Sequence, residues 1–154
     1  MVEAAFSVVP GDGAYRAATE LGWAMQIVSD FGSNDISLAA FNAWVRPAVN
    51  LGQISFIFRS PSGLPCAYAT WAYLSQPVHD QFLQRGPRLL SLAEWNEGTH
   101  LWIVDVQARS GSVPFLKTVV LQDAVKHHTK VYGARYDING SRSLKCVRLP
   151  EQDF

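Results

Sequence analysis

Hydrophobic residues follow two different spacings along the chain, and each spacing predicts one kind of secondary structure. Apolar residues recur every three or four positions in three segments, as they do on one face of an amphipathic helix. These predicted helices are residues 14–28, 36–45 and 113–128. β-Branched and aromatic residues predominate in five other segments, which we predict to be strands. The predicted strands are residues 53–59, 64–74, 101–107, 131–136 and 144–149.

Turn and cap residues lie between these segments and predict where the elements end. Ser60-Pro61-Ser62-Gly63 and Asn139-Gly140 favour hairpins between neighbouring strands. Asn34 or Asp35 is expected to cap the second helix, because their side chains accept hydrogen bonds from the first helical amides. The same helix is expected to stop before Pro47, since proline disfavours helical conformation in the residue that precedes it.

The order of the predicted elements indicates an α+β fold. Two helices precede two strands, and a strand, a helix and two more strands follow. Between these groups, residues 77–88 form a short helix or a loop, followed by a helical turn at residues 89–93. The order favours a three-layer sandwich in which helices cover both faces of a mixed, mostly antiparallel sheet. With 154 residues we expect one domain, residues 1–154, in which residues 1–13 are a flexible arm or a short edge strand.

The composition excludes several classes of protein. Hydrophobic residues make up 48% of the chain and aromatic residues 12%, which is too apolar for a disordered protein. No apolar run is long enough to span a membrane and the first residues lack the pattern of a signal peptide, so we expect a cytoplasmic protein. Cys66 and Cys146 are far apart and have no metal-binding spacing, so we expect two buried thiols, no disulfide and no metal site.

The formal charge is zero overall but is unevenly distributed. Residues 1–105 contain 5 Lys and Arg against 9 Asp and Glu, and residues 106–154 contain 8 against 4. A basic C-terminal part suits an acidic protein partner, although charged residues also serve simply to keep a surface solvated. The basic residues are too few to predict nucleic-acid binding.

The predicted strand at residues 101–107 contains a carboxylate, Asp105, within an apolar run. An ionised carboxyl group that is removed from water costs free energy unless it has a partner or a chemical role. Burial raises the pKa of a carboxyl group, which suits it to accepting a proton. The structural alternative is that Asp105 caps a loop or pairs with Arg109.

Two sequence blocks resemble a known family. The first is residues 65–72, Pro-Cys-Ala-Tyr-Ala-Thr-Trp-Ala, and it follows an upstream segment at residues 41–49. The second contains Glu94-Trp95, Gly98, Trp102 and Asp105. Together, over roughly residues 21–149, they resemble the toxin-activating lysine acyltransferases. This resemblance implies an acetyltransferase-like (GNAT) fold that moves a fatty acyl group from acyl carrier protein to a lysine side chain of a protein.

The resemblance also implies catalytic positions. The essential aspartate of the family falls on Asp105, its essential histidine on Ser33, and a nearby serine on Asp30. The first 78 residues contain no histidine, so another group has to serve as the base. The alternatives are Asp105 alone, Asp30 or Asp35, or a histidine from another element such as His100.

The histidines and the aromatic residues have structural interpretations as well. His100 lies five residues before Asp105, and strand alternation places the two on opposite faces unless a bulge intervenes. We expect His100 to begin a strand, His79 to lie in a loop, and His127 and His128 to end a helix. The aromatic residues of the strands and of the Glu94-Trp95 block are expected in the core, namely Trp71, Trp95, Trp102, Phe56 and Phe58.

The segment after the strand precedes a helix, which is where an acetyltransferase fold holds a phosphopantetheine group. The residues expected to contact that group are Gln107, Arg109, Ser110, Gly111 and Ser112. The resemblance makes this group part of the donor, the phosphopantetheine thioester of acyl carrier protein, with acyl-CoA as the less favoured donor. We expect no permanently bound cofactor.

The predicted function is therefore a fatty acyltransferase that modifies a lysine or ornithine side chain of a protein or a ribosomal peptide. Its expected partners are acyl carrier protein and the acceptor, and a homodimer is compatible with the sequence. Two alternatives stay open. One is a module that binds an acyl chain or a leader peptide without turnover, and the other is an acetyl-CoA-dependent N-acetyltransferase.

Overall fold

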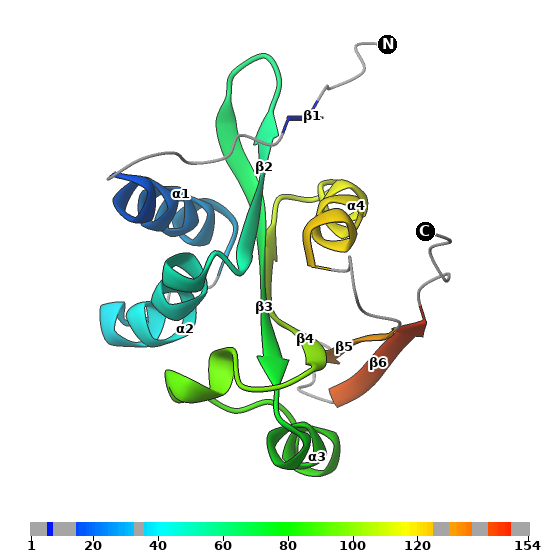
Figure 1. The fold of residues 1–154 in the computed structure, drawn as a ribbon. Coiled ribbons are helices and arrows are strands. Elements are labelled where there is room, and N and C mark those ends of the chain that lie inside the picture. Colours follow the sequence, from blue (N-terminus) through cyan, green and yellow to red (C-terminus); the bar gives the residue numbers. More distant parts are fainter. Residues whose placement is uncertain (1–5, 8–14, 33–35, 125–129, 137–141, 149–154) are drawn as a thin grey trace.

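The computed structural model describes residues 6–7, 15–32, 36–124, 130–136 and 142–148 (Figure 1). Its helices are α1 (Arg16–Phe31), α2 (Leu38–Leu51), α3 (Gln76–Arg85), the short 3-10 helix η1 (Ala93–Trp95) and α4 (Val113–Ala124). Its strands are β1 (Phe6–Ser7), β2 (Ile54–Arg59), β3 (Leu64–Leu74), β4 (His100–Ala108), β5 (Lys130–Tyr136) and β6 (Arg142–Arg148).

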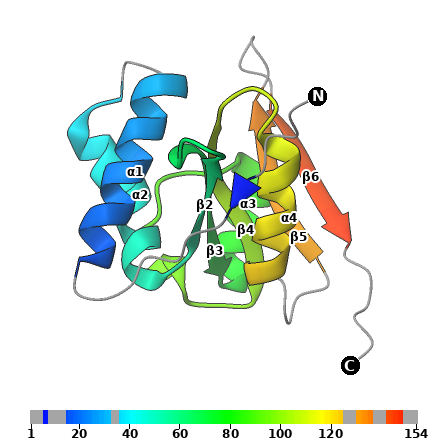
Figure 2. The same cartoon turned by 90° about the horizontal axis from the view of Figure 1, so that it is seen from above.

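The strands form one mixed sheet in which β1 to β6 lie in chain order. All neighbouring pairs are antiparallel except β4 and β5, which are parallel because α4 connects them. Helices α1 and α2 cover one face of the sheet and α4 covers the other (Figures 1 and 2). The predicted α+β sandwich with a mostly antiparallel sheet is thus confirmed, and part of the N-terminal arm is a short edge strand on β2.

Each face of the sheet has its own apolar core. The α1/α2 face contains the larger core, which includes Phe56, Phe58, Trp95 and Trp102. The α4 face contains a smaller core of mainly aliphatic residues around Trp71. All five aromatic residues that the sequence assigned to the core are buried, as predicted. Among the helices that the structure describes, none combines the length and the apolar character that a membrane crossing requires.

Helix α2 differs from its prediction at both ends. Its N-cap is Ser37, whose hydroxyl accepts a hydrogen bond from the amide of Ala40 at 3.1 Å, whereas the predicted caps Asn34 and Asp35 lie outside the described residues. The helix also continues through Pro47 to Gly52, which adopts a left-handed conformation (φ +67°) and ends it. The apolar face of the helix is buried on both sides of Pro47, and this packing offsets the hydrogen bond that proline cannot donate.

The predictions for His79 and Cys146 were wrong, because tertiary packing decides the environment of both residues. His79 is buried in α3, where its Nδ1 accepts a hydrogen bond from Trp102 Nε1 at 2.9 Å and its ring stacks on His100. Cys146 is exposed on β6, the last strand of the sheet, whereas Cys66 is buried as predicted. The predicted turn at Asn139-Gly140, and His127 and His128, lie outside the described residues.

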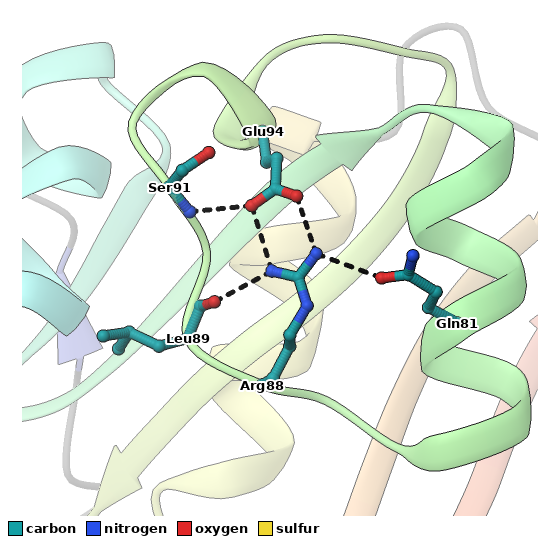
Figure 3. Close-up of polar contacts among 5 residues, drawn as sticks. All are labelled: Gln81, Arg88, Leu89, Ser91 and Glu94. Atoms are coloured by element: carbon teal, nitrogen blue, oxygen red, sulfur yellow. Dashed lines mark hydrogen bonds and ion pairs between the residues drawn. The ribbon is translucent and has the colours of Figure 1, made fainter.

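The segment between α3 and β4 is held by one ion pair (Figure 3). Both terminal nitrogens of the Arg88 guanidinium donate to the Glu94 carboxylate, at 3.0 and 2.6 Å, and the amide of Ser91 donates to the same group at 2.8 Å. Chiefly because of the Arg88 hydrogen bonds, the pKa of Glu94 is lowered to about 2. The ionised form of Glu94 therefore stabilises this segment, which includes the buried Trp95 of η1.

We expect Glu94→Gln to lower the free energy of unfolding by up to about 1 kcal/mol at pH 7, because the pair is partly exposed to solvent. The folded-state pKa is lower than the ordinary value of 4.5, so the contribution is present above pH 4.5 and is lost as the pH falls towards 2. Urea unfolding at several pH values measures this. The difference in free energy of unfolding between variant and parent should become smaller as the pH is lowered. A difference that stayed constant from pH 7 to pH 2.5 would contradict the prediction.

Candidate active site

An irregularity in β4 determines where Asp105 points. Thr70 of β3 is opposite Asp105, but the next residue, Trp71, is opposite Ile103, so Val104 is an extra residue in β4. Such a bulge changes the alternation of side chains along a strand. Val104 packs against the α1/α2 core, and Asp105 faces the same side instead of the opposite one. The bulge therefore places the carboxylate on the α1/α2 face of the sheet.

Asp105 lies in a pocket of about 240 Å³ between this face of the sheet and the two N-terminal helices. Most of the pocket is apolar. The lining residues are Val28, Ile36, Ala40, Phe41, Trp44, Val45, Tyr68, Asp105 and Gln107. The pocket is large enough for the end of an aliphatic side chain, and among the described residues that line it Asp105 is the only carboxylate.

Two neutral side chains donate hydrogen bonds to Asp105. The Tyr68 hydroxyl donates to Oδ2 at 2.6 Å, and Gln107 Nε2 donates to Oδ1 at 3.3 Å. Burial raises the pKa of Asp105, and the hydrogen bonds from Tyr68 and Gln107 oppose this rise without cancelling it. Arg109 is exposed in the turn after β4, and the described contacts of Asp105 include no ion pair with it. The carboxylate is thus partly buried beside dipoles rather than beside a cation, which favours proton uptake.

Tyr68 belongs to the block at residues 65–72, but the sequence alone predicts no role for its side chain. Burial and the nearby Asp105 carboxylate raise the pKa of Tyr68, so its hydroxyl stays protonated and acts as a donor. Gln107, which is predicted to contact the donor group, has its side chain in the Asp105 pocket. The pairing of β3 with β4 is the feature that places Tyr68 and Gln107 beside Asp105, because Tyr68 lies directly opposite Gln107.

The end of α1 borders this pocket. A side chain at Gly32 would place its Cβ 3.2 Å from Gln107 Oε1 and 2.7 Å from the carbonyl oxygen of Val28, so only glycine fits without a shift. Ile36, where the described chain resumes, lines the pocket. Ser33 lies between these two positions but outside the described residues. Asp30 is exposed on the last turn of α1 and does not line the pocket.

His100 is too far along β4 to reach this carboxylate. The bulge puts the two side chains on the same face, since the His100 ring stacks on His79 of α3 at a centroid distance of 4.0 Å. Five residues of strand nevertheless separate them, which corresponds to roughly 15 Å. Nε2 of His100 instead contacts Gln76 Oε1 at 2.8 Å. In the described part of the chain, the pocket therefore contains no histidine.

The predicted donor loop forms a tight turn between β4 and α4. The Ser112 amide donates to the Arg109 carbonyl at 3.0 Å, and Gly111 has a positive φ of +87° that this turn requires. Arg109, Ser110 and Gly111 are exposed. Ser112 is buried with its hydroxyl 3.7 Å from Cys66 Sγ, so this hydroxyl faces the core rather than a ligand.

Strands β4 and β5 separate at the level of the bulge. They pair only at Trp102 with Tyr132 and at Ile103 with Gly133, although β4 continues to Ala108. A second cavity of about 240 Å³ lies on the α4 face at this point. The described residues that line it are all aliphatic, namely Ala69, Ile103, Val106, Val113, Leu116, Val120, Val131 and Val147. Asp105 and Val106, which are adjacent in sequence, thus face two different cavities on opposite faces of the sheet.

No group of three or more potential metal ligands is present among the described residues. The hydrogen-bond donors on the Asp105 carboxylate include the side chains of Tyr68 and Gln107 and the backbone amide of Val106.

Similarity to known proteins extends over most of the chain. One solved structure with a similar fold, titled as the crystal structure of histone acetyltransferase HPA2 and related acetyltransferase from Corynebacterium glutamicum, is 10% identical. The match covers 87% of this chain and 78% of that one, with a TM-score of 0.41. A search of curated proteins finds no match. The model of the RTX toxin acyltransferase family matches residues 17–148, and the chain therefore belongs to that family.

Proposed function

We propose that this protein transfers a fatty acyl group from the phosphopantetheine thioester of acyl carrier protein to a side-chain amine, with Asp105 as the general base. The acceptor is a lysine or ornithine of a protein or a ribosomal peptide. The observation that carries the proposal is the position of Asp105, a partly buried carboxylate with a raised pKa at the wall of a mostly apolar pocket. Membership in a family of toxin acyltransferases supports the class of reaction.

Proton transfer is the part of the reaction that needs a base. A lysine amine has a pKa of about 10.4, so at neutral pH only about one molecule in a thousand is uncharged and nucleophilic. The ammonium ion loses one proton to solvent as its aliphatic stem enters the apolar pocket, and Asp105 accepts a second proton as nitrogen attacks. A base with a raised pKa is better matched to this step than an ordinary aspartate.

The remaining bonds follow from this transfer. The amine nitrogen forms a bond to the thioester carbonyl carbon, and the carbon–sulfur bond breaks. The proton held by Asp105 passes to the departing sulfur, so the products are an amide, a free thiol and the regenerated carboxylate. The Tyr68 hydroxyl donates to Asp105 throughout and holds its oxygen atoms in one orientation.

The donor is proposed to approach the free edge of β4. Between Val104 and Ala108 this strand has no partner on the β5 side in the described structure, so its backbone groups are open to a ligand with peptide-like amides. The exposed cations Arg109, Lys130, Lys145 and Arg148 lie in the same C-terminal half of the chain. They support an acidic carrier protein as partner, because charge complementarity speeds and orients docking.

Ser33 and Asp30 stay proposed assistants of Asp105. Position 33 is close in sequence both to Gly32, where a Cβ would lie 3.2 Å from Gln107 Oε1, and to the pocket-lining Ile36. Asp30 is exposed on α1 and is the weaker of the two.

We expect Asp105→Asn to lower kcat/KM by about 10² to 10⁴-fold, the usual contribution of a positioned general base. The assay combines the purified protein, acyl carrier protein charged with tetradecanoate, and Nα-acetyl-lysine amide or Nα-acetyl-ornithine amide, and mass spectrometry detects the acylated amine. Glu97→Gln, which changes an exposed carboxylate, is the matched control and should retain activity. Full activity of Asp105→Asn would remove Asp105 from the mechanism. Donor binding without transfer in the parent protein would favour a binding module.

The same variant has an expected effect on stability that shows whether it is folded. The pKa of Asp105 is raised above its ordinary value of 3.8, so ionising this group destabilises the folded state as the pH rises through the folded-state pKa. Asp105→Asn should therefore gain stability relative to the parent between pH 4 and pH 8. Urea unfolding measures the difference in free energy of unfolding between the variant and the parent. If this difference became smaller as the pH rises, the pKa of Asp105 would not be raised in the folded protein.

We expect Tyr68→Phe to move the low-pH limb of kcat/KM to higher pH. The hydrogen bond from Tyr68 lowers the pKa of Asp105, so its removal leaves burial less opposed and raises that pKa further. A pH profile of both proteins with the same donor and acceptor measures the shift. A uniform loss at every pH, with the limb unmoved, would mean that Tyr68 acts only on structure.

A further inference from the structure

The aliphatic cavity on the α4 face is separate from the Asp105 pocket but close to it. Its eight lining side chains come from β3, β4, β5, β6 and α4, and none of them is polar. A ligand with polar groups would lose its hydrogen bonds to water here and gain none, which costs free energy. The chemistry of the lining thus selects a hydrocarbon ligand.

The cavity is open to solvent on one side. Val106, Val113 and Val147 line it and are 42%, 53% and 41% exposed, respectively, whereas Leu116 and Val120 form its buried floor. A hydrocarbon that enters covers exposed aliphatic surface, and each buried methylene improves binding about fourfold. The exposed valines therefore mark the mouth of the cavity.

The position of the cavity links it to the reacting atoms. Val106 lines it, and the preceding residue, Asp105, lines the acceptor pocket on the other face. The free edge of β4 connects the two faces, because β5 separates from β4 after Ile103. A thioester carbonyl at this edge would have its hydrocarbon tail on the α4 face and the attacking amine on the α1/α2 face.

Gly133 leaves space beside this cavity. Residue 133 is opposite Ile103, the last β4 residue paired with β5, and it shares a face with Val131, two positions earlier. A Cβ at this position would meet only the Cβ of Ile103, at 3.8 Å. The φ angle of Gly133 is not positive, so the backbone accepts a larger residue here.

We propose that this aliphatic cavity binds the hydrocarbon tail of the acyl donor, and that the absence of a side chain at Gly133 sets how long a tail fits. The inference rests on the proposed acyl transfer, and it identifies the surface that selects the length of the acyl chain. A side chain at position 133 would extend from β5 beside Ile103 and take up space that the tail otherwise occupies. Short chains would be affected less than long ones.

The experiment measures binding rather than turnover. Hexanoyl, decanoyl and tetradecanoyl thioesters of pantetheine are titrated into the full chain by calorimetry, without an acceptor. The parent protein should bind the longer chains more tightly, by about fourfold for each methylene that enters the cavity. Gly133→Val should weaken tetradecanoyl binding at least tenfold and leave hexanoyl binding within about twofold, since each displaced methylene removes one such factor.

Two further variants separate the cavity from general damage to the sheet. Ala134→Val adds bulk at the next position of β5, whose side chain points to the other face, and should leave the chain-length profile unchanged. Val147→Thr keeps the shape of a partly exposed lining residue but introduces a hydroxyl, and should weaken every chain that reaches it.

An unchanged profile in Gly133→Val, with the variant folded as judged by circular dichroism, would overturn the inference. So would an equal loss in Ala134→Val. If the thioesters bind with the expected dependence on position 133 but no amide forms with any acceptor, the cavity assignment stands and the proposed transfer fails. If transfer occurs but substitution at position 133 does not change the preference for acyl chain length, the proposed transfer stands and the cavity assignment fails.

Discussion

The extra residue in β4 is the feature on which the arrangement of the site depends. In a strand that alternates regularly, Asp105 would share a face with Ile103 and Leu101, both of which pack on the α4 side. An ionised group there would lie in the smaller, mainly aliphatic core. Because Val104 is inserted, the carboxylate instead reaches Tyr68 and Gln107 on the other face. One inserted residue therefore separates the polar part of the site from the aliphatic part.

The hydrogen-bond partners of Asp105 determine its basicity because they carry no positive charge. A guanidinium at the same distance would have stabilised the ionised form and lowered the pKa, which would make the group a poorer base. A hydroxyl and an amide supply hydrogen bonds without a full charge, so burial still dominates and the pKa is raised. This arrangement costs stability at neutral pH. Such costs are typical of residues retained for reactivity rather than for folding.

Local patterns were sufficient to predict most elements, whereas the site depended on register. Hydrophobic spacing identified α1, α2, α4 and the hairpin of β2 and β3, and the buried run identified β4 with Asp105 inside it. The bulge has no local signal, because Val104 and Asp105 look like any apolar–polar pair. Tyr68 meets Asp105 across 37 positions of sequence, and His79 is buried only because α3 packs on Trp102. Helix α2 passes Pro47 for the same reason: tertiary burial of one face outweighed a local preference.

Water is the competitor that this geometry has to exclude. A base able to deprotonate an amine can also activate water, and a thioester attacked by water is lost as free acid. In the proposed reaction, the apolar residues around Asp105, among them Phe41 and Trp44, leave little for a water molecule to bind besides the carboxylate and its hydrogen-bond donors. The acyl tail, on the far side of β4, would close the aliphatic cavity as it enters. Access of amine and tail from opposite faces would thus exclude water from both sides of the carbonyl, and it requires the gap that opens where β5 leaves β4.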